Sequence, residues 1–447
     1  MKPNYYLYAY KAQISTVMRK CVSILLLSLL SVTAFFAYAE NDKKQHDFFV
    51  IYGKIIDVDT KAPLHFASIT LEGTNIANVT NSEGFFSLKL PLDIYGDRTI
   101  TTSHLGYMST TLKVADFLGS SDSKPLIINM KSVPLSLDPA TIRGYDARSL
   151  FYEAYGRIKE NYPQKSVGMT AFYREMVKKG GSRYLSLNEA IIDIEKAAYD
   201  NFFSSDKAAV YKGRGSINYN SSDTLFIHYQ GGVMSSLYID LVKRPFAGVY
   251  FESIDNYYNF KMGQSALIDN KFFYVVEFDQ KTKDPEATIL YRGRIYIESE
   301  SLAIGRIEFA MNVEGRKDAG GIFVPKKPAN LRVDVEQATY IVNYKEYDGL
   351  WYYDYARLEV KFSTRRRRAI FRNYYSVLSE MAVTDHKVGE FKIDPEKRVR
   401  YKDMLSERVK DFRDDDFWEN YNIIEPDASI DAIIRRIIRQ LRRRENN

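Results

Sequence analysis

Three acidic residues in the middle of the chain have the types and spacing that could support catalytic chemistry. Glu189, Asp193 and Glu195 recur at odd positions of one stretch with strand-like alternation. An enzyme that hydrolyses glycosidic bonds uses two carboxyl groups about 5–10 Å apart, one of which acts as an acid. Nothing in the sequence brings two of these groups into one cleft, and carboxylates on strands are usually solvated. A hydrolase is therefore kept as an alternative interpretation.

Arg174 and Glu189 form the constellation that carries the main site prediction. The alternating stretches on either side of Gly180-Gly181 predict a hairpin, since this dipeptide tolerates the positive φ of a tight hairpin turn. With a two-residue turn, Arg174 faces Leu187, and Glu189 lies diagonally across on the same face. The same face carries three apolar side chains, which are Phe172, Met176 and Leu185. We expect a buried ion pair; a polar group inside a ligand cavity is the alternative.

The histidines and the single cysteine do not form a recognisable metal or nucleophile site. Zinc peptidases need His-x-x-Glu or His-Glu-x-x-His. No histidine of this chain has glutamate in either register; the five are His46, His65, His104, His228 and His386. No Gly-x-Ser-x-Gly elbow or Walker loop is present. The sequence therefore predicts no catalytic residue, no metal and no cofactor.

Two groups of arginines could contact an anionic surface. They are Arg365, Arg366, Arg367 and Arg368 in one run, and Arg435 and Arg436 near the end of the chain. The first run predicts a hairpin tip or a charged edge that discourages strand pairing. The second lies in residues 425–447, which predict a helix with an isoleucine stripe on one side and arginines on the other. Packing of that stripe on a sheet is the main interpretation, and contact with anionic lipid or lipopolysaccharide is the alternative.

The N-terminus has the pattern of a secretion signal. Arg19 and Lys20 precede an apolar run, and Ala37-Tyr38-Ala39 is a small-x-small cleavage site, so we expect residues 1–39 to be removed, with Met18 as an alternative start. This removes four of the 63 basic residues and no acidic ones, which leaves 59 against 57 and a net charge of +2. It also removes Cys21, the only cysteine. We therefore expect an exported protein that does not bind nucleic acid and has no membrane span after cleavage.

The stretch from residue 49 to residue 90 predicts a small β-sandwich. Short apolar strands are separated by turns, and the pieces in order are Phe49–Thr60, Ala62-Pro63-Leu64, Ala67–Thr74 and Thr80–Phe86. This order closely resembles the carboxypeptidase-regulatory-like family. The resemblance implies a transthyretin-like sandwich that acts as a non-catalytic accessory domain of bacterial envelope proteins, including TonB-dependent receptors. We expect this domain at 48–131 and a linker at 132–145.

Residues 146–424 predict a larger antiparallel α+β domain. Asp146 opens a helix with apolar residues at helical spacing, and a long series of alternating stretches follows. The series does not alternate with helices, so a parallel dinucleotide-binding sheet is disfavoured. With Ala171–Glu175 opening the sheet, this order resembles uncharacterised envelope proteins that carry the same sandwich in front. A curved sheet around a helix is also similar to the half-barrels of lipoprotein carriers.

Together these features predict a mainly β protein with some α structure, exported to the periplasm or associated with the outer membrane. The main interpretation is a non-enzymatic binding or scaffolding module whose partner is another envelope protein, a lipid or a glycan. The alternatives are the hydrolase described above and an accessory subunit of a TonB-dependent receptor.

Overall fold

The computed structural model describes most of the chain after residue 47. The described residues are 48–94, 97–133, 146–181, 183–201, 203–217, 232–246, 249–282, 288–324, 327–387, 391–409, 417–418, 420–428, 430–435 and 439. The expected signal segment, most of the expected linker and Arg436 lie outside these residues. Residues Phe48–Asn447 belong to one compact unit.

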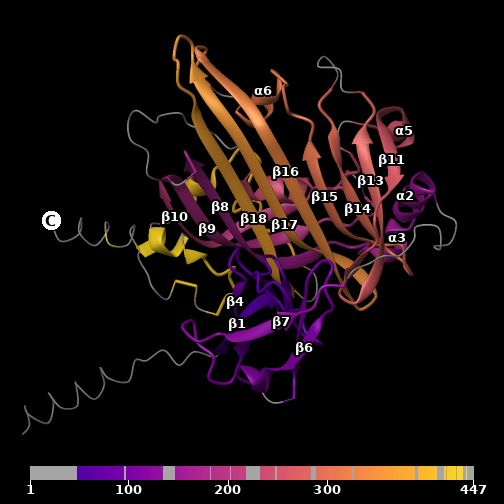
Figure 1. Ribbon diagram of the computed structural model, residues 1–447, viewed down its shortest axis with the longest axis vertical. Coiled ribbons are helices and arrows are strands. Elements are labelled where there is room, and N and C mark those ends of the chain that lie inside the picture. Colours follow the sequence, from indigo (N-terminus) through magenta and orange to yellow (C-terminus); the bar gives the residue numbers. More distant parts are fainter. Residues whose placement is uncertain are drawn as a thin grey trace, which may run out of the picture. The chain divides into compact units, whose positions relative to one another are not determined.

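The N-terminal part is a sandwich of two small sheets (Figure 1). One sheet has the order β4-β1-β7, from Phe85–Pro91, Phe48–Asp57 and Leu126–Met130. The other has the order β3-β2-β5-β6, from Ala77–Val79, Ser68–Leu71, Thr99–Ser103 and Thr110–Lys113. Alternate residues of β1, such as Ile51 and Ile55, are buried between the sheets, as the period of two requires.

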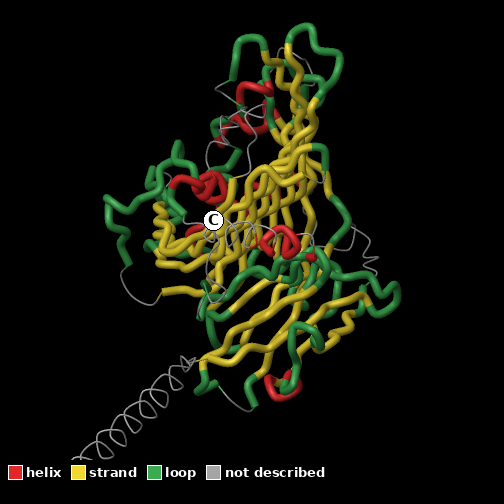
Figure 2. Tube along the Cα trace, turned by 90° about the vertical axis from the view of Figure 1, so that its left-hand side faces the viewer, coloured by secondary structure: helices red, strands yellow, loops and turns green. Residues whose placement is uncertain are grey.

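The larger part is one open antiparallel sheet of eleven strands among the described residues (Figure 2). Its order is β10-β9-β8-β18-β17-β16-β15-β14-β13-β11, with β12 paired to β13. The bounds of the first half are Val167–Lys179 (β8), Arg183–Lys196 (β9), Lys207–Ile217 (β10), Tyr258–Met262 (β11) and Ala266–Ile268 (β12). The second half comprises Lys271–Gln280 (β13), Tyr291–Glu298 (β14), Ile304–Met311 (β15), Leu331–Tyr347 (β16), Leu350–Arg366 (β17) and Asn373–Lys387 (β18). The prediction of a sandwich followed by an antiparallel α+β domain is confirmed.

Short helices cover one face of the large sheet. Helix α2 (Ala147–Gly156) starts at Asp146, whose side chain accepts hydrogen bonds from the backbone N–H groups of Arg148 and Ser149. The other helices are α3 (Ile158–Asn161), α4 (Gly232–Tyr238), α5 (Ile254–Tyr257) and α6 (Ala319–Phe323). Leu150 and Phe151 of α2 share an apolar core with odd-numbered residues of β8, such as Tyr173.

The opposite face of the sheet is covered by the sandwich and by the C-terminal segment. Phe172 of β8 packs in one cluster with Val79 of the sandwich and with Trp418 and Ile424. We call residues 420–428 the strap, because they run between the sandwich and the sheet. The strap residue Asn422 exchanges hydrogen bonds with the backbone N–H (2.7 Å) and carbonyl (3.4 Å) of Lys89, and Asn78 donates to the carbonyl of Ile423 at 2.7 Å.

The helix predicted over residues 425–447 begins later than expected. Residues 421–427 are not helical, and the described helical residues start at Ala428. Asp427 accepts a hydrogen bond from the backbone N–H of Ile430 at 2.9 Å and so acts as the helix cap. Pro426 precedes this cap, and its carbonyl accepts from Asn81 of the sandwich at 3.2 Å. The strap contacts therefore take the residues that the sequence pattern assigned to the first turn.

Candidate functional site

A row of five charged residues crosses the sheet at the face covered by the strap. We call it the charge row; the residues lie directly opposite one another on five neighbouring strands, in the order Arg214 (β10), Glu189 (β9), Arg174 (β8), Glu380 (β18) and Arg357 (β17). Opposite residues of an antiparallel pair point to the same face. The signs alternate along the row, so each carboxylate has a guanidinium on either side.

The centre of the charge row is desolvated and fully paired. Arg174 lies 2.7 Å from Glu189 and 3.2 Å from Glu380, and its side chain is 1% exposed. Arg214 approaches the second oxygen of Glu189 at 2.9 Å. Burial alone would raise the pKa of Glu189, but the charges of Arg174 and Arg214 outweigh burial and lower it. Glu189 therefore stays ionised and cannot serve as a proton donor near neutral pH.

Each arginine of the charge row is also contacted by a segment that covers this face of the sheet. The carbonyl of Ile424 in the strap accepts a hydrogen bond from Arg174 at 2.8 Å. The ring of Trp418 lies 4.9 Å from the Arg214 guanidinium, and the ring of Phe66, from the sandwich, lies 4.6 Å from that of Arg357. The covering segments therefore supply a dipole or a ring face to every cation of the row.

The register of the β8–β9 hairpin differs from the prediction. Arg174 lies opposite Glu189 and not opposite Leu187, which pairs with Met176. The ladder resumes from Lys179 to Arg183, so the connection is one residue longer than a two-residue turn, and an irregularity between Val177 and Lys178 adds a second residue. Two one-residue shifts preserve the face of every side chain. The diagonal pairing was therefore wrong, while the shared face remained.

The other two carboxylates of the hydrolase alternative are also held by cations. Asp193 pairs with Lys387 at 2.5 Å. Glu195 pairs with Lys207 and accepts a hydrogen bond from the backbone N–H of Ile393 at 3.0 Å. Although burial opposes it, these partners lower the pKa of Glu195. A general acid needs a raised pKa, so neither this residue nor Glu189 fits that role.

A second buried charge cluster lies on the helix-covered side of the sheet. Lys196 bridges Asp206 at 2.9 Å and Asp240 at 2.7 Å. Tyr199 and Tyr344 also donate hydrogen bonds to Asp240, at 3.0 Å and 2.6 Å. The sequence pattern gave no sign of this cluster, because its members come from β9, from the loops before β10 and after α4, and from β16. It holds the helical layer on the sheet.

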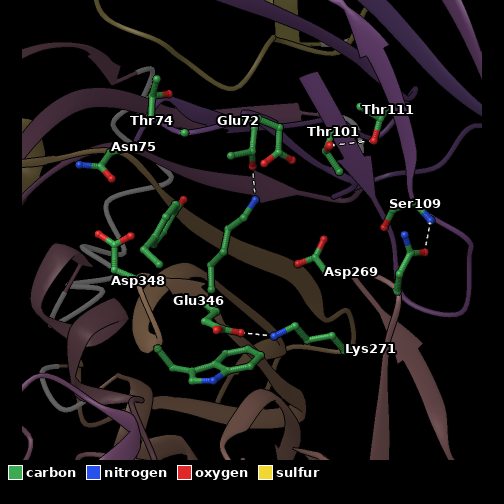
Figure 3. Close-up of a pocket in the computed structure, with 16 residues that line it drawn as sticks. Glu72, Thr74, Asn75, Thr101, Ser109, Thr111, Asp269, Lys271, Glu346 and Asp348 are labelled. Carbon is green, nitrogen blue, oxygen red and sulfur yellow. Dashed lines mark hydrogen bonds and ion pairs between the residues drawn. The ribbon is translucent and has the colours of Figure 1, made fainter. Parts of the chain in front are cut away.

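A pocket of about 590 Å³ lies between the four-stranded sheet of the sandwich and the ends of the large sheet (Figure 3). We call it the junction pocket. From the sandwich it is lined by Thr70, Glu72, Thr74, Asn75, Thr101, Ser109 and Thr111, and from the large sheet by Asp269, Asn270, Lys271, Lys345, Glu346, Tyr347, Asp348 and Trp351. Most of these are hydroxyl, amide or charged side chains.

Two tight hairpin turns place polar groups in the junction pocket. Asp269 and Asn270 connect β12 to β13, and both have positive φ, at 51° and 57°. Asp348 and Gly349 connect β16 to β17 with φ of 50° and 79°. Two consecutive positive φ values are typical of the turns that suit the twist of a hairpin. The side chains of Asp269 and Asp348 thus lie at fixed places in the wall.

Hydrogen bonds on two sides of the junction pocket join the sandwich to the large sheet and so fix the distance between the two walls. Asn270 accepts from the backbone N–H of Ser109 at 2.8 Å. On the other flank Lys345 donates to Ser68 at 3.0 Å and to Thr70. Inside, Lys271 pairs with Glu346. The pocket therefore presents both acceptors and donors at prearranged positions.

All three described histidines lie near this junction. The ring of His104 contacts the carbonyls of Leu105 (3.1 Å) and His65 (3.2 Å). The ring of His386 lies between those of Tyr347 and Tyr352, with centroids at 5.1 Å and 5.2 Å. Burial lowers the pKa of His104 and of His386 to about 4. Both imidazoles are therefore neutral in the folded protein near pH 7.

The arginine run 365–368 lies at the end of β17 that is remote from the junction pocket, since Trp351, near the start of the same strand, lines the pocket. Arg365 and Arg366 end β17, and Arg367 and Arg368 lie in its connection to β18. Arg435 pairs with Asp431 at 2.7 Å on the C-terminal helix. In that helix Ile430 and Ile434 pack on Met176 and Leu187, which joins its apolar side to the sheet.

Among the described residues, no group of three or more histidine, cysteine, aspartate or glutamate side chains could hold a metal ion. In the same part of the chain, no helix is long and apolar enough to span a bilayer.

The fold and its junction define a class of protein in which a small sandwich is joined to an open antiparallel sheet. Residues 51–140 match the model of the CarboxypepD_reg-like domain family, which confirms the predicted resemblance of the sandwich. No curated protein matches the chain.

Solved structures resemble the chain only weakly. A DUF1329 family protein from Desulfovibrio piger is 11% identical, with a TM-score of 0.26, over 55% of this chain and 96% of that one. A putative outer membrane lipoprotein-sorting protein domain from Vibrio parahaemolyticus is 10% identical, with a TM-score of 0.23, over 55% and 94%. MucB, solved in complex with MucA, is 10% identical, with a TM-score of 0.17, over 53% and 94%. At these TM-scores the likeness supports no argument about function.

Replacing Arg174 or Glu189 with alanine should destabilise the protein strongly and non-additively. Each single substitution leaves a buried charge without its partner, which typically costs about 3–5 kcal/mol. The double variant should lose less than the sum, with a coupling of roughly 0.5–3 kcal/mol. Chemical denaturation of the four proteins measures both quantities.

The same sheet supplies a matched control. Arg294 and Glu277 also lie opposite each other and pair at 3.3 Å, but Arg294 is 55% exposed. Their alanine variants should change stability by about 0–1 kcal/mol. Two small, independent losses at Arg174 and Glu189 would contradict the buried network.

The stability of the protein should fall as the pH decreases from 6.5 to 4. In this window the unfolded chain protonates its histidines, while His104 and His386 stay neutral in the folded state. The unfolded state therefore binds more protons, and each imidazole should remove roughly 1–3 kcal/mol of unfolding free energy. Denaturation at several pH values should give a flatter dependence for His386→Phe than for the wild type.

Asp354 provides a control of opposite sign. Burial raises the pKa of Asp354 to about 6, so this group favours the folded state at low pH. Asp354→Asn should make the loss of stability on acidification steeper. Equal slopes in the wild type, the histidine variant and the asparagine variant would rule out this account.

Proposed function

We propose that the protein is an exported, non-enzymatic envelope protein that binds a hydroxyl-rich ligand, such as a glycan, in the junction pocket. The single observation that carries this proposal is the pocket itself: about 590 Å³ of space with polar walls held at a fixed width from both sides. This volume is in the range of small-molecule sites. The sandwich acts as an accessory domain that supplies one wall.

The chemistry of the walls favours neutral, polyhydroxylated ligands over lipids and anions. Four carboxylates and two ammonium groups line the pocket, and they are Glu72, Asp269, Glu346, Asp348, Lys271 and Lys345. A hydroxyl group can donate to a carboxylate and accept from an ammonium or amide group. An acyl chain would leave these groups unpaired and desolvated, which is costly. An anion would meet an excess of negative charge.

We propose no catalytic activity, because the acidic residues of the hydrolase alternative are held in ion pairs. Glu189, Asp193 and Glu195 are all held by basic side chains. The match of residues 51–140 to a CarboxypepD_reg-like domain is consistent with an accessory role. Export to the periplasm or the outer membrane is supported by the signal pattern of residues 1–39.

Binding of neutral oligosaccharides should change the fluorescence of Trp351, which lines the junction pocket. The chain has two tryptophans, so Trp418→Phe leaves Trp351 as the only reporter. Titration with a panel of neutral oligosaccharides should give a saturable signal. Asp269→Asn and Glu72→Gln should each weaken binding by about 10-fold, since one charged hydrogen bond is worth about 1.5 kcal/mol or more.

The matched control is Asp97→Asn, whose side chain is 96% exposed on the sandwich outside the pocket. This variant should bind like the parent protein. Saturable binding of acidic oligosaccharides or cationic peptides, with none of neutral sugars, would disprove the proposed ligand class. If an outer-membrane receptor copurifies with the exported protein, the protein would instead be an accessory subunit of that receptor.

A further inference from the structure

The connection of the β17–β18 hairpin contains two adjacent apolar side chains that are exposed to solvent. Ile370 is 86% exposed and Phe371 is 85% exposed. Both residues belong to the connection between β17 and β18, and this connection lies at the top of Figure 1. Soluble proteins tolerate single exposed apolar residues, but an adjacent pair at a protruding tip is typical of a contact surface.

A concentration of arginines surrounds this apolar pair. Arg366, Arg367 and Arg368 precede it, Arg372 follows it, and all four are exposed. None of the guanidinium groups of residues 365–368 forms an ion pair with a described residue. The mature chain is expected to be nearly neutral overall, so this concentration is local.

The pairing next to the tip adds to the positive charge. Arg365 lies directly opposite Arg332 on β16, and like charges in this position lower the stability of a sheet. Asp334 offsets part of this charge, since it contacts Arg332 at 2.6 Å and Arg372 at 3.3 Å. No such compensation exists among the described residues for the run 365–368. Ion pairs with described residues therefore relieve only part of the repulsion at this end of the sheet.

The neighbouring hairpin brings further basic residues to the same end of the sheet. The backbone N–H of Gly180, in the β8–β9 turn, donates to the carbonyl of Tyr374 at 2.9 Å. This contact places Lys178, Lys179 and Arg183 beside the start of β18. We call this end of the sheet, with residues 365–374 at its centre, the basic tip.

We propose that the basic tip docks on the surface of an anionic lipid bilayer. The arginines would contact lipid phosphates, and Ile370 and Phe371 would insert at the boundary between headgroups and acyl chains. A basic segment with exposed apolar residues is the pattern of proteins that lie on membranes without spanning them. Electrostatic attraction adds only about 1 kcal/mol of binding free energy per arginine, which is about 5-fold in affinity, and it falls off within a Debye length of the membrane surface. Binding therefore needs both the arginines and the apolar pair.

Docking through the basic tip would set the distance of the junction pocket from the membrane. Strand β17 has 17 residues; its second residue, Trp351, lines the pocket, and its last, Arg366, lies at the tip. At about 3.3 Å per residue, the strand spans roughly 55 Å. The pocket would thus be held in solution while the tip contacts lipid. This proposal does not depend on the ligand of the pocket.

Vesicle flotation with the exported, processed protein tests the proposal. Vesicles of phosphatidylcholine containing phosphatidylglycerol should bind the protein at low salt and release it at high salt, and vesicles of phosphatidylcholine alone should bind it poorly. The double substitution Arg367→Gln and Arg368→Gln should lower the partition coefficient by roughly 25-fold, about 5-fold for each arginine. Ile370→Ser with Phe371→Ser should lower it by about 10-fold or more.

Two matched variants separate docking from unspecific effects. Arg367→Lys with Arg368→Lys keeps the charge and should retain most of the binding. Phe203→Ser removes a ring that is 99% exposed elsewhere on the protein, and it should bind like the wild type. All variants should keep the wild-type thermal transition, because the substituted side chains are exposed. Binding that is insensitive to salt, to phosphatidylglycerol or to the tip substitutions would overturn the proposal, as would the absence of binding.

Discussion

The requirement to satisfy the buried arginines Arg174 and Arg214 organises the larger domain and the segments that cover it. The charge row contains three guanidinium groups and two carboxylates, and Glu359 adds a third carboxylate 3.7 Å from the partly exposed Arg357. A buried charge is tolerated only when its remaining donors are satisfied. The strap carbonyl of Ile424 and the rings of Trp418 and Phe66 meet this requirement. The charge pattern of the sheet therefore requires the segments that cover it.

This constraint explains how the sandwich becomes part of a functional surface. Phe66 and the strap hold the sandwich over one portion of the sheet, and the edge of the covered portion is where the junction pocket forms. The sandwich and the sheet each contribute only half of the polar groups in its walls. The binding site that we propose is thus a product of the docking of the two parts.

The sequence was informative where local alternation decides the outcome. The shared face of Arg174 and Glu189 follows from the period of two, and it survived a register that was shifted by two residues. Glu380 was not predictable as a partner of Arg174, because a pairing over 206 residues leaves no local signal. Arg214 lies only 25 residues from Glu189, but alternation alone does not fix the register of β10 against β9. Glu380 alone gave a hint, as a charge inside the apolar stretch 377–383. The junction pocket was not predictable for the same reason, since its hairpin turns are far in the sequence from the sandwich residues that form the other wall.

The position of the strap after the last strand of the sheet has a consequence for the order of folding. The sandwich contains its own core and needs nothing that follows it in the sequence to form its two sheets. The charge row, by contrast, stays uncovered until Trp418 and Ile424 pack over it, and both residues follow every strand of the sheet in the sequence. We therefore expect the core of the sandwich to form before the charge row is closed, with the strap as the last element to take its place.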